Sequence, residues 1–271
     1  MNVEAVSYYI TNWIKDYVKD SGMNGMVVGV SGGVDSALTA TLCARTGLPL
    51  RVVEMPIHQA AGQVNRAEEL ILHLRRKYPN VTPEKFDLTP VFESFKEHLP
   101  DEAVAYGIDH PAKMQLSLAN TRARLRMTAL YFYAGLYGLL VVGTGNKIED
   151  FGVGFFTKYG DGGVDISPIA DLMKSEVYAL AGYLGVPESI LKAAPTDGLF
   201  GDNRTDEDQL GASYDELEWA MNLKNEKNTS HNLTPRQKEV WEIYQKWNRA
   251  NRHKMEPIPV CHIPEHIRNQ K

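Results

Sequence analysis

The chain has 271 residues, of which 43% are hydrophobic and 23% charged, and its formal net charge is −5. This composition is typical of one large globular domain, and the acidic balance excludes a bulk attraction to nucleic acid or anionic membranes. Cys43 and Cys261 lack CxxC spacing, so neither a disulfide framework nor a zinc site is indicated. The N-terminal segment is amphipathic rather than signal-like, and no run is long enough to span a membrane. We therefore expect a cytoplasmic protein that binds neither nucleic acid nor membranes.

Helical and apolar patterns alternate along the first half of the chain. Residues 3–20 carry apolar side chains at three- and four-residue spacing, which predicts an amphipathic helix. Short apolar runs then predict strands at 26–30, 50–56, 84–88 and 139–145. Between them, helical patterns occupy 35–46, 63–78, 91–99 and 113–137. This alternation predicts an α/β fold, a doubly wound parallel sheet with helices on both faces.

The second half is less periodic. Its glycine-dense segment 151–170 predicts a long ordered loop, a type that is usually functional in compact domains. The patterns after it predict two short helices at 173–184 and 187–193, an acidic polar loop at 197–212, a helix at 213–223, a mobile linker at 225–232 and a final helix at 234–251.

The first predicted strand ends in the motif SGGVDS, residues 31–36, and a helix follows at once. Glycines at such a turn let an anion approach the backbone, and the N–H groups and dipole of a helix N-terminus favour negative charge. The motif lacks the lysine of a Walker A loop and the spacing of a dinucleotide turn. A carboxylate here, Asp35, indicates a divalent cation bound beside a phosphate. The alternative is that Asp35 only caps the helix.

Three arginines occupy alternate positions in NTRARLRM, residues 120–127, on a predicted helix. One helix face cannot carry Arg122, Arg124 and Arg126 together, so at least one points inward and needs an anionic partner. The alternative is a solvated basic stripe with ordinary ion pairs.

GTGNKIED, residues 143–150, begins at the end of the fourth predicted strand, where parallel sheets bind ligands. Glu149 is placed to supply a second carboxylate for a metal held by Asp35. Lys158, in the segment FFTKYGDGG, and Lys174 are candidates for neutralising phosphate charge. Taken alone, each of these side chains is more typical of a solvated surface.

SGGVDS closely resembles the pyrophosphate-binding loop of the ATP pyrophosphatases. Over residues 24–257 the chain resembles the ammonia-dependent NAD synthetase family, in the ordered blocks SGGVDS, NTRARLRM, GTGNK-E, GFFTKYGDGGVDISPI, the lysine of DLMKSEVY, PT-G-L, LGASYDELE and the final HK. The resemblance implies that ATP adenylates the nicotinate carboxylate of deamido-NAD (nicotinic acid adenine dinucleotide). Ammonia then displaces AMP, giving NAD, AMP and pyrophosphate. It also implies Mg²⁺ as cofactor and a homodimer, for which the helices at 3–20 and 113–137 are interface candidates.

The same resemblance implies roles for individual residues. ATP would be bound by Gly29, Val30, Ser31, Gly32, Gly33, Val34, Asp35 and Ser36, together with Thr144, Lys174 and Thr196. Deamido-NAD would be bound by Arg124, Lys158, Asp165, His253 and Lys254. Asp35 and Glu149 would bind Mg²⁺, and the catalytic set would be Asp35, Lys158 and Lys174. No nucleophilic side chain is required, because the attacking groups belong to the substrate and to ammonia.

Two segments depart from the family pattern. Some members have an arginine where Glu54 stands, so Glu54, His58 and Gln59 stay outside the candidate site. The segment between Glu149 and Lys158 is one residue longer than in some members. The expected organisation is one synthetase domain over 1–271 without a glutaminase domain, with ammonia as nitrogen source. Two other readings stay open: another ATP pyrophosphatase, such as a tRNA-modifying enzyme, and a nucleotide-binding regulatory module without turnover.

Overall fold

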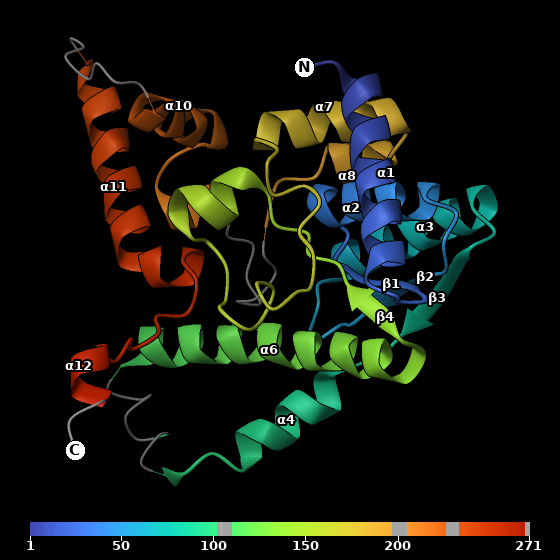
Figure 1. The fold of residues 1–271 in the computed structure, drawn as a ribbon, viewed down its shortest axis with the longest axis horizontal. Helices are drawn as coiled ribbons and strands as arrows, with labels where there is room; N and C mark the ends of the chain where they lie inside the picture. Colours follow the sequence, from blue (N-terminus) through green and yellow to red (C-terminus); the bar gives the residue numbers. More distant parts are fainter. Residues whose placement is uncertain (102–103, 105–109, 197–204, 226–232, 269–271) are drawn as a thin grey trace.

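The fold is built on one parallel sheet of four strands in the order β3-β2-β1-β4, as seen in a computed structural model (Figure 1). The structure describes all residues except 102–103, 105–109, 197–204, 226–232 and 269–271. The strands are β1 (Gly25–Val30), β2 (Leu50–Glu54), β3 (Val81–Lys85) and β4 (Leu139–Val141). Because β1 pairs in parallel with both β2 and β4, it is a central strand whose carboxyl end lies between theirs.

Helices surround the sheet and extend beyond it. Their bounds are α1 (Val3–Asp20), α2 (Val34–Arg45), α3 (Ala61–Lys77), α4 (Thr89–Glu97), α6 (Pro111–Tyr137), a π-helix η1 (Ile148–Val153), α7 (Lys174–Leu184), α8 (Glu188–Leu191), α9 (Asp206–Leu210), α10 (Tyr214–Asn225), α11 (Pro235–Met255) and α12 (Glu265–Arg268). No described helix is both apolar enough and long enough to cross a membrane.

Both faces of the sheet are buried. Because successive side chains of a strand point to opposite faces, Met26 and Val28 of β1 pack with α1, α2 and α7, while Val27 packs with α4 and α6. Each of these three side chains is fully buried. The predicted doubly wound α/β fold with helices on both faces is therefore confirmed.

A third apolar cluster lies beside the sheet and joins η1, α10 and α11. Its buried members include Ile148, Leu217, Val240 and Tyr244. This cluster holds the second half of the chain against the carboxyl end of β4, where the candidate site was expected.

The third strand lies earlier than predicted, at Val81–Lys85 instead of 84–88. It is an edge strand, and an edge position tolerates Pro83, whose missing N–H would interrupt a central strand. The strands β2 and β4 are shorter than predicted and end at Glu54 and Val141. Val142 still donates its N–H to the Val27 carbonyl of β1 at 2.9 Å, and it also forms an isolated bridge to Ile166.

The irregular second half holds more helix than predicted. The π-helix η1 begins before the expected loop 151–170 and extends into its first residues. The expected loop 197–212 contains α9, whose N-terminus is capped reciprocally by Thr205 and Asp208. The predicted helices of this half, α7, α8, α10 and α11, follow in the predicted order. Residues 197–204 and 226–232, which include most of the predicted linker, lie outside the described residues.

Candidate active site

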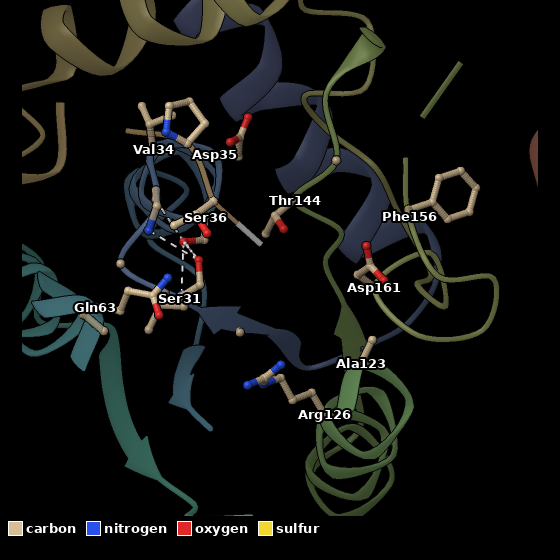
Figure 2. Close-up of a pocket in the computed structure, with 18 of the residues that line it drawn as sticks. Ser31, Val34, Asp35, Ser36, Gln63, Ala123, Arg126, Thr144, Phe156 and Asp161 are labelled. Atoms are coloured by element: carbon tan, nitrogen blue, oxygen red, sulfur yellow. Dashed lines mark hydrogen bonds between the residues drawn. The ribbon is translucent and has the colours of Figure 1, made fainter. Parts of the chain in front are cut away.

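The turn between β1 and α2 forms a loop whose polar groups face a cavity (Figure 2). Gly32 has a φ of +80°, and a Cβ there would lie 2.5 Å from the carbonyl oxygen of Gln63, so only glycine fits. The N–H of Ser31 donates to Ser36 Oγ at 3.2 Å, and the N–H of Gly33 donates to Ser31 Oγ at 3.3 Å. The hydroxyl oxygens of Ser36 and Ser31 thus accept these N–H groups at positions where the oxygens of a bound anion would accept them.

The N-terminus of α2 is open. Its N-cap residue is Gly33, which makes no side-chain capping bond, and the first-turn N–H groups of a helix lack intrahelical acceptors. Asp35 does not cap the helix, so that alternative is wrong. Its carboxylate accepts hydrogen bonds from Asn146 and Lys174 instead. The open helix end is therefore a suitable site for phosphate.

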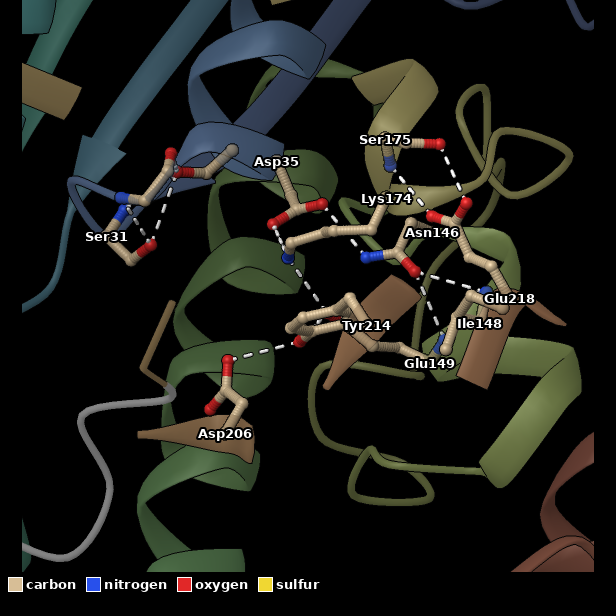
Figure 3. A network of polar contacts seen from close by, with 12 residues as sticks. Ser31, Asp35, Asn146, Ile148, Glu149, Lys174, Ser175, Asp206, Tyr214 and Glu218 are labelled. Atoms are coloured by element: carbon tan, nitrogen blue, oxygen red, sulfur yellow. Dashed lines mark hydrogen bonds and ion pairs between the residues drawn. The ribbon is translucent and has the colours of Figure 1, made fainter. Parts of the chain in front are cut away.

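Lys174 joins the two candidate metal ligands (Figure 3). It is 3% exposed, and its Nζ donates to Asp35 Oδ2 at 2.7 Å and to Glu149 Oε1 at 3.0 Å. Burial by itself lowers the pKa of Lys174, but the charges of the two carboxylates outweigh burial and raise the pKa above its ordinary value. The side chain expected to contact ATP thus lies between two acids that face the same cavity.

Asn146 connects the same two acids through one buried amide. Its Nδ2 donates to Asp35 Oδ1 at 3.0 Å, and its Oδ1 accepts from the N–H groups of Ile148 and Glu149, both at 3.1 Å. Sequence reasoning missed this residue. The available signal was its position inside GTGNK, directly after a buried strand.

The segment between Glu149 and Lys158, which was expected to be longer than in some family members, begins within the π-helix η1. The N–H of Gly154, which ends this helix with a φ of +65°, donates to the carbonyl of Glu149, five residues earlier. A π-turn holds one more residue than an α-turn. This π-turn directly follows Glu149, whose carboxylate lies beside Lys174.

The donor set around Lys174 fits a magnesium ion. Two carboxylates already contact one cationic group beside the phosphate loop, and Mg²⁺ typically takes one or two protein carboxylates plus phosphate oxygens and waters. Within the described part of the chain, no group of three or more His, Cys, Asp and Glu is arranged to hold a metal. Asp35 and Glu149 would therefore be the protein's share of the ligands, and the nucleotide would complete them.

A cavity of about 260 Å³ brings together every residue that was assigned to ATP. Its wall includes the segment 29–36, Thr144, Lys174 and Thr196, and also Glu149. Figure 2 shows Ser31 and Ser36 on one side of this space and Arg126 and Asp161 on another. Glu54 and Gln59, which were left outside the candidate site, also line the cavity. Lining residues that sequence reasoning did not assign to the site include Met55, Gln63, Arg126, Asp150 and Asp161.

The three arginines of α6 point in different directions, as their spacing predicted. Arg126 faces the cavity, where its Nη2 donates to Gln59 Oε1 at 2.8 Å. Arg122 lies over the ring of Phe92, 4.3 Å from its centroid. Arg124 is exposed and donates to the carbonyl oxygen of Lys158. The excluded Gln59 thus belongs to the cavity wall, and it is held there by an arginine 67 residues away in the chain.

Four of the five residues assigned to deamido-NAD gather where the 155–163 loop meets α6 and α11. Besides the contact of Arg124, Lys158 Nζ donates to the His253 carbonyl at 2.5 Å, and Lys254 Nζ donates to the Phe156 carbonyl at 2.7 Å. The structure does not bring this group onto the wall of the 260 Å³ cavity.

Asp165, the fifth residue, lies apart from that group and anchors β4. Its carboxylate accepts the N–H of Val141 at 2.7 Å and the hydroxyl of Tyr131 at 2.9 Å. The structure therefore shows a supporting contact for Asp165 and no link to the other four.

Two acids on the cavity wall have raised pKa values. Burial, with the neighbouring charge of Glu149, raises the pKa of Asp150 to about 8. Asp161 is exposed and lines the cavity, and desolvation by the protein around it raises its pKa to about 6 although the Thr157 N–H donates to it. Both carboxyl groups can therefore exchange protons near neutral pH.

Comparison with known proteins assigns this arrangement to a family. The family model described as NAD synthase matches residues 6–258. The chain belongs to the NAD synthase family. It is 37% identical over 219 residues to the NH3-dependent NAD(+) synthetase of Carboxydothermus hydrogenoformans, covering 80% of this chain and 85% of that one. The NH3-dependent NAD(+) synthetase of Syntrophomonas wolfei is 36% identical, with coverage of 99% and 100%.

Solved structures agree with this NAD synthase assignment. An NMN synthetase from Francisella tularensis superposes with a TM-score of 0.80 at 31% identity, covering 97% of this chain and 100% of that one. The NH3-dependent NAD synthetase of Campylobacter jejuni superposes with a TM-score of 0.74 at 27% identity and the same coverage. The resemblance inferred from the ordered motifs is thereby confirmed for the family and the fold.

Proposed function

We propose that this chain is an ammonia-dependent NAD synthetase that uses ATP to activate the nicotinate carboxylate of deamido-NAD. One observation carries the proposal: in an NAD synthase chain, the open phosphate loop and the acid pair Asp35 and Glu149 face one cavity. We also propose that residues 1–271 form one synthetase domain, which uses free ammonia as its nitrogen source.

The loop N–H groups and the N-terminus of α2 bind the ATP phosphates. Asp35 and Glu149 would hold Mg²⁺, which would supply positive charge to the phosphates. Lys174 lies within hydrogen-bond reach of both acids and adds a positive charge beside the phosphates. Because the attacking carboxylate and the phosphates are both anionic, this concentration of positive charge lowers the barrier.

The reaction has two balanced steps. A nicotinate oxygen bonds to the α-phosphorus, the bond from this phosphorus to the oxygen bridging to the β-phosphate breaks, and pyrophosphate leaves. Ammonia then bonds to the acyl carbon, the bond to AMP breaks, and the nitrogen loses a proton. We assign Asp161 to take this proton, because it lines the cavity and its pKa is about 6.

The acceptor would approach from the side of the cluster formed by Arg124, Lys158, His253 and Lys254. Three of these side chains are cationic, and cationic groups suit the phosphates of a dinucleotide. Two copies of the chain would pair through α1 and α6, both of which expose large apolar side chains, including Tyr9 and Phe132. The resemblance to the family supports this homodimer.

Turnover with defined substrates tests the proposal. The protein with ATP, Mg²⁺, ammonium and deamido-NAD is expected to form NAD and AMP in equal amounts. Asp35→Asn is expected to lower kcat by about 100-fold or more, because a metal ligand is lost. The control is Asp171→Asn, an aspartate 97% exposed and paired with Lys147. Full activity of Asp35→Asn would contradict the metal role, and AMP formed only with tRNA would indicate a different ATP pyrophosphatase.

Nicotinic acid mononucleotide is the second candidate acceptor. The observation that favours it is the superposition with an NMN synthetase at a TM-score of 0.80. Both acceptors carry the same nicotinate carboxylate on a ribose phosphate, so both can be adenylated by the same groups. Measuring kcat/KM for each acceptor decides between them. We expect deamido-NAD to have the higher value, and a higher value for the mononucleotide would overturn that choice.

A further inference from the structure

Tyr214 lies at the start of α10, in the segment LGASYDELE, which has no role in the site described so far. Its side chain is 5% exposed. Its hydroxyl lies 2.6 Å from Glu149 Oε1 and 3.3 Å from Asp206 Oδ2, and the Lys174 ammonium lies 4.5 Å from its ring centroid (Figure 3). One side chain therefore contacts both a proposed metal ligand and the lysine that accompanies it.

The distances decide where the hydroxyl proton points. A tyrosine hydroxyl has one proton to donate, and the shorter contact assigns it to Glu149. Lys174 also donates to Oε1 of this carboxylate. Among the described residues, no hydrogen bond ends on its other oxygen, Oε2. Tyr214 and Lys174 thus both donate to Oε1 of Glu149, and Oε2 is left to face a cation.

Tyr214 is itself held firmly. Its backbone N–H donates to Glu207 Oε1 at 3.0 Å, which ties the start of α10 to α9. Its ring belongs to the third apolar cluster with Leu217 and Tyr244. Burial, with the charges of Glu149 and Asp206, raises the pKa of the hydroxyl, so it remains a donor at any working pH.

We propose that Tyr214 is a positioning residue, whose hydroxyl fixes the rotation of the Glu149 carboxylate so that Oε2 faces the magnesium ion of the ATP complex. Its ring also places the Lys174 ammonium against the same carboxylate. This inference rests on the proposed function for the identity of the bound nucleotide. Residues that orient metal ligands in this way typically change metal affinity or activity by about 10- to 100-fold when removed.

Metal binding tests this proposal apart from turnover. Mn²⁺ is titrated into the protein with α,β-methylene ATP, which cannot be cleaved at the reacting bond, and free Mn²⁺ is followed by electron paramagnetic resonance. Tyr214→Phe is expected to bind Mn²⁺ about 10- to 100-fold more weakly than the original protein. The control is Tyr244→Phe in the same cluster, whose hydroxyl is buried without a partner among the described residues. It is expected to bind Mn²⁺ unchanged.

A double-mutant cycle separates positioning from general loosening of the cluster. Glu149→Gln alone weakens Mn²⁺ binding, and adding Tyr214→Phe is expected to cause no further loss, because the hydroxyl acts through that carboxylate. Losses that multiply would overturn the proposal, as would unchanged Mn²⁺ affinity in Tyr214→Phe. If the original protein makes no NAD, the proposed function fails, whereas the cycle still decides the role of Tyr214.

Discussion

The charged side chains that line the cavity fall into two groups. Lys174 is paired with Asp35 and Glu149, so each buried charge has an opposite neighbour. Asp150 and Asp161 instead have raised pKa values and exchange protons near neutrality. The pairing places a positive charge between the two proposed metal ligands, and the raised pKa values supply groups that can take a proton during catalysis.

Asp161→Asn is expected to change the pH dependence of stability. The pKa of Asp161 is about 6 in the folded chain against an ordinary value of 3.8, so the folded state binds more protons between these values. Its favourable contribution is present below pH 3.8 and is lost as the pH rises through about 6. Asparagine does not titrate and keeps the oxygen that accepts from Thr157. The free energy of unfolding of the variant should therefore rise relative to the original protein between pH 4 and pH 7.

Urea unfolding with EDTA present measures this difference at several pH values. A difference that stays constant from about pH 4 to pH 7 would contradict the raised pKa of Asp161.

Among the elements, η1 connects the site to the end of α11. It spans Ile148–Val153, and the N–H of Gly154, which ends it, donates to the carbonyl of Glu149. A Cβ at Gly154 would collide with Asn251 of α11 and would lie 2.8 Å from Met255 Cε. Lys254 donates to the Gly154 carbonyl at 2.9 Å. The exit of η1 and the end of α11 are thus packed as one unit, which also sets the position of His253 and Lys254.

Gly154→Ala is expected to lower the free energy of unfolding by at least about 1–2 kcal/mol, because alanine is strained at positive φ and the added methyl meets α11. The control is Gly182→Ala in α7, where nothing lies within 4 Å of the new Cβ. That change should raise stability by about 0.5–1 kcal/mol, since alanine favours helix. Urea unfolding of both variants provides the comparison, and a Gly154→Ala protein as stable as the original would refute the packing argument.

Among the described residues, the helices α1 and α6 each expose several large apolar side chains. On α1, Tyr8 and Tyr9 are 68% and 71% exposed, and on α6, Phe132 and Leu136 are 59% and 58% exposed. Such concentrations on single helices are typical of protein interfaces. They agree with the proposed homodimer, in which a second copy of the chain would cover them.

Sedimentation equilibrium tests the dimer. The original protein should have twice the mass of one chain, and Phe132→Glu should shift it toward the monomer because a charge would be buried at the interface. Leu72→Glu, at a 50% exposed position on α3, is the matched control and should leave the dimer intact. Equal masses for all three proteins would place the interface elsewhere, and a monomeric original protein would reject the homodimer.

The order of elements and the position of the phosphate loop could be read from the chain alone. Apolar runs report burial on both faces of a strand, and parallel strands bring their carboxyl ends to one edge, so Ser31 and Thr144 were expected to meet there. The edge strand β3 was misplaced because its half-exposed residues carry no such pattern. The π-turn after Glu149 was not predicted, because the glycine-dense segment 151–170 carries no helical periodicity.

The sequence by itself determined the fold class, the family and the loop 31–36 at the end of the first strand, since these follow from local periodicity and contiguous motifs. Only the tertiary structure decided which side chains face one another. Lys174 meets Asp35 across 139 residues of chain, and Tyr214 meets Glu149 across 65. Such contacts depend on how three apolar clusters pack, and packing is a property of the whole chain that no short motif encodes.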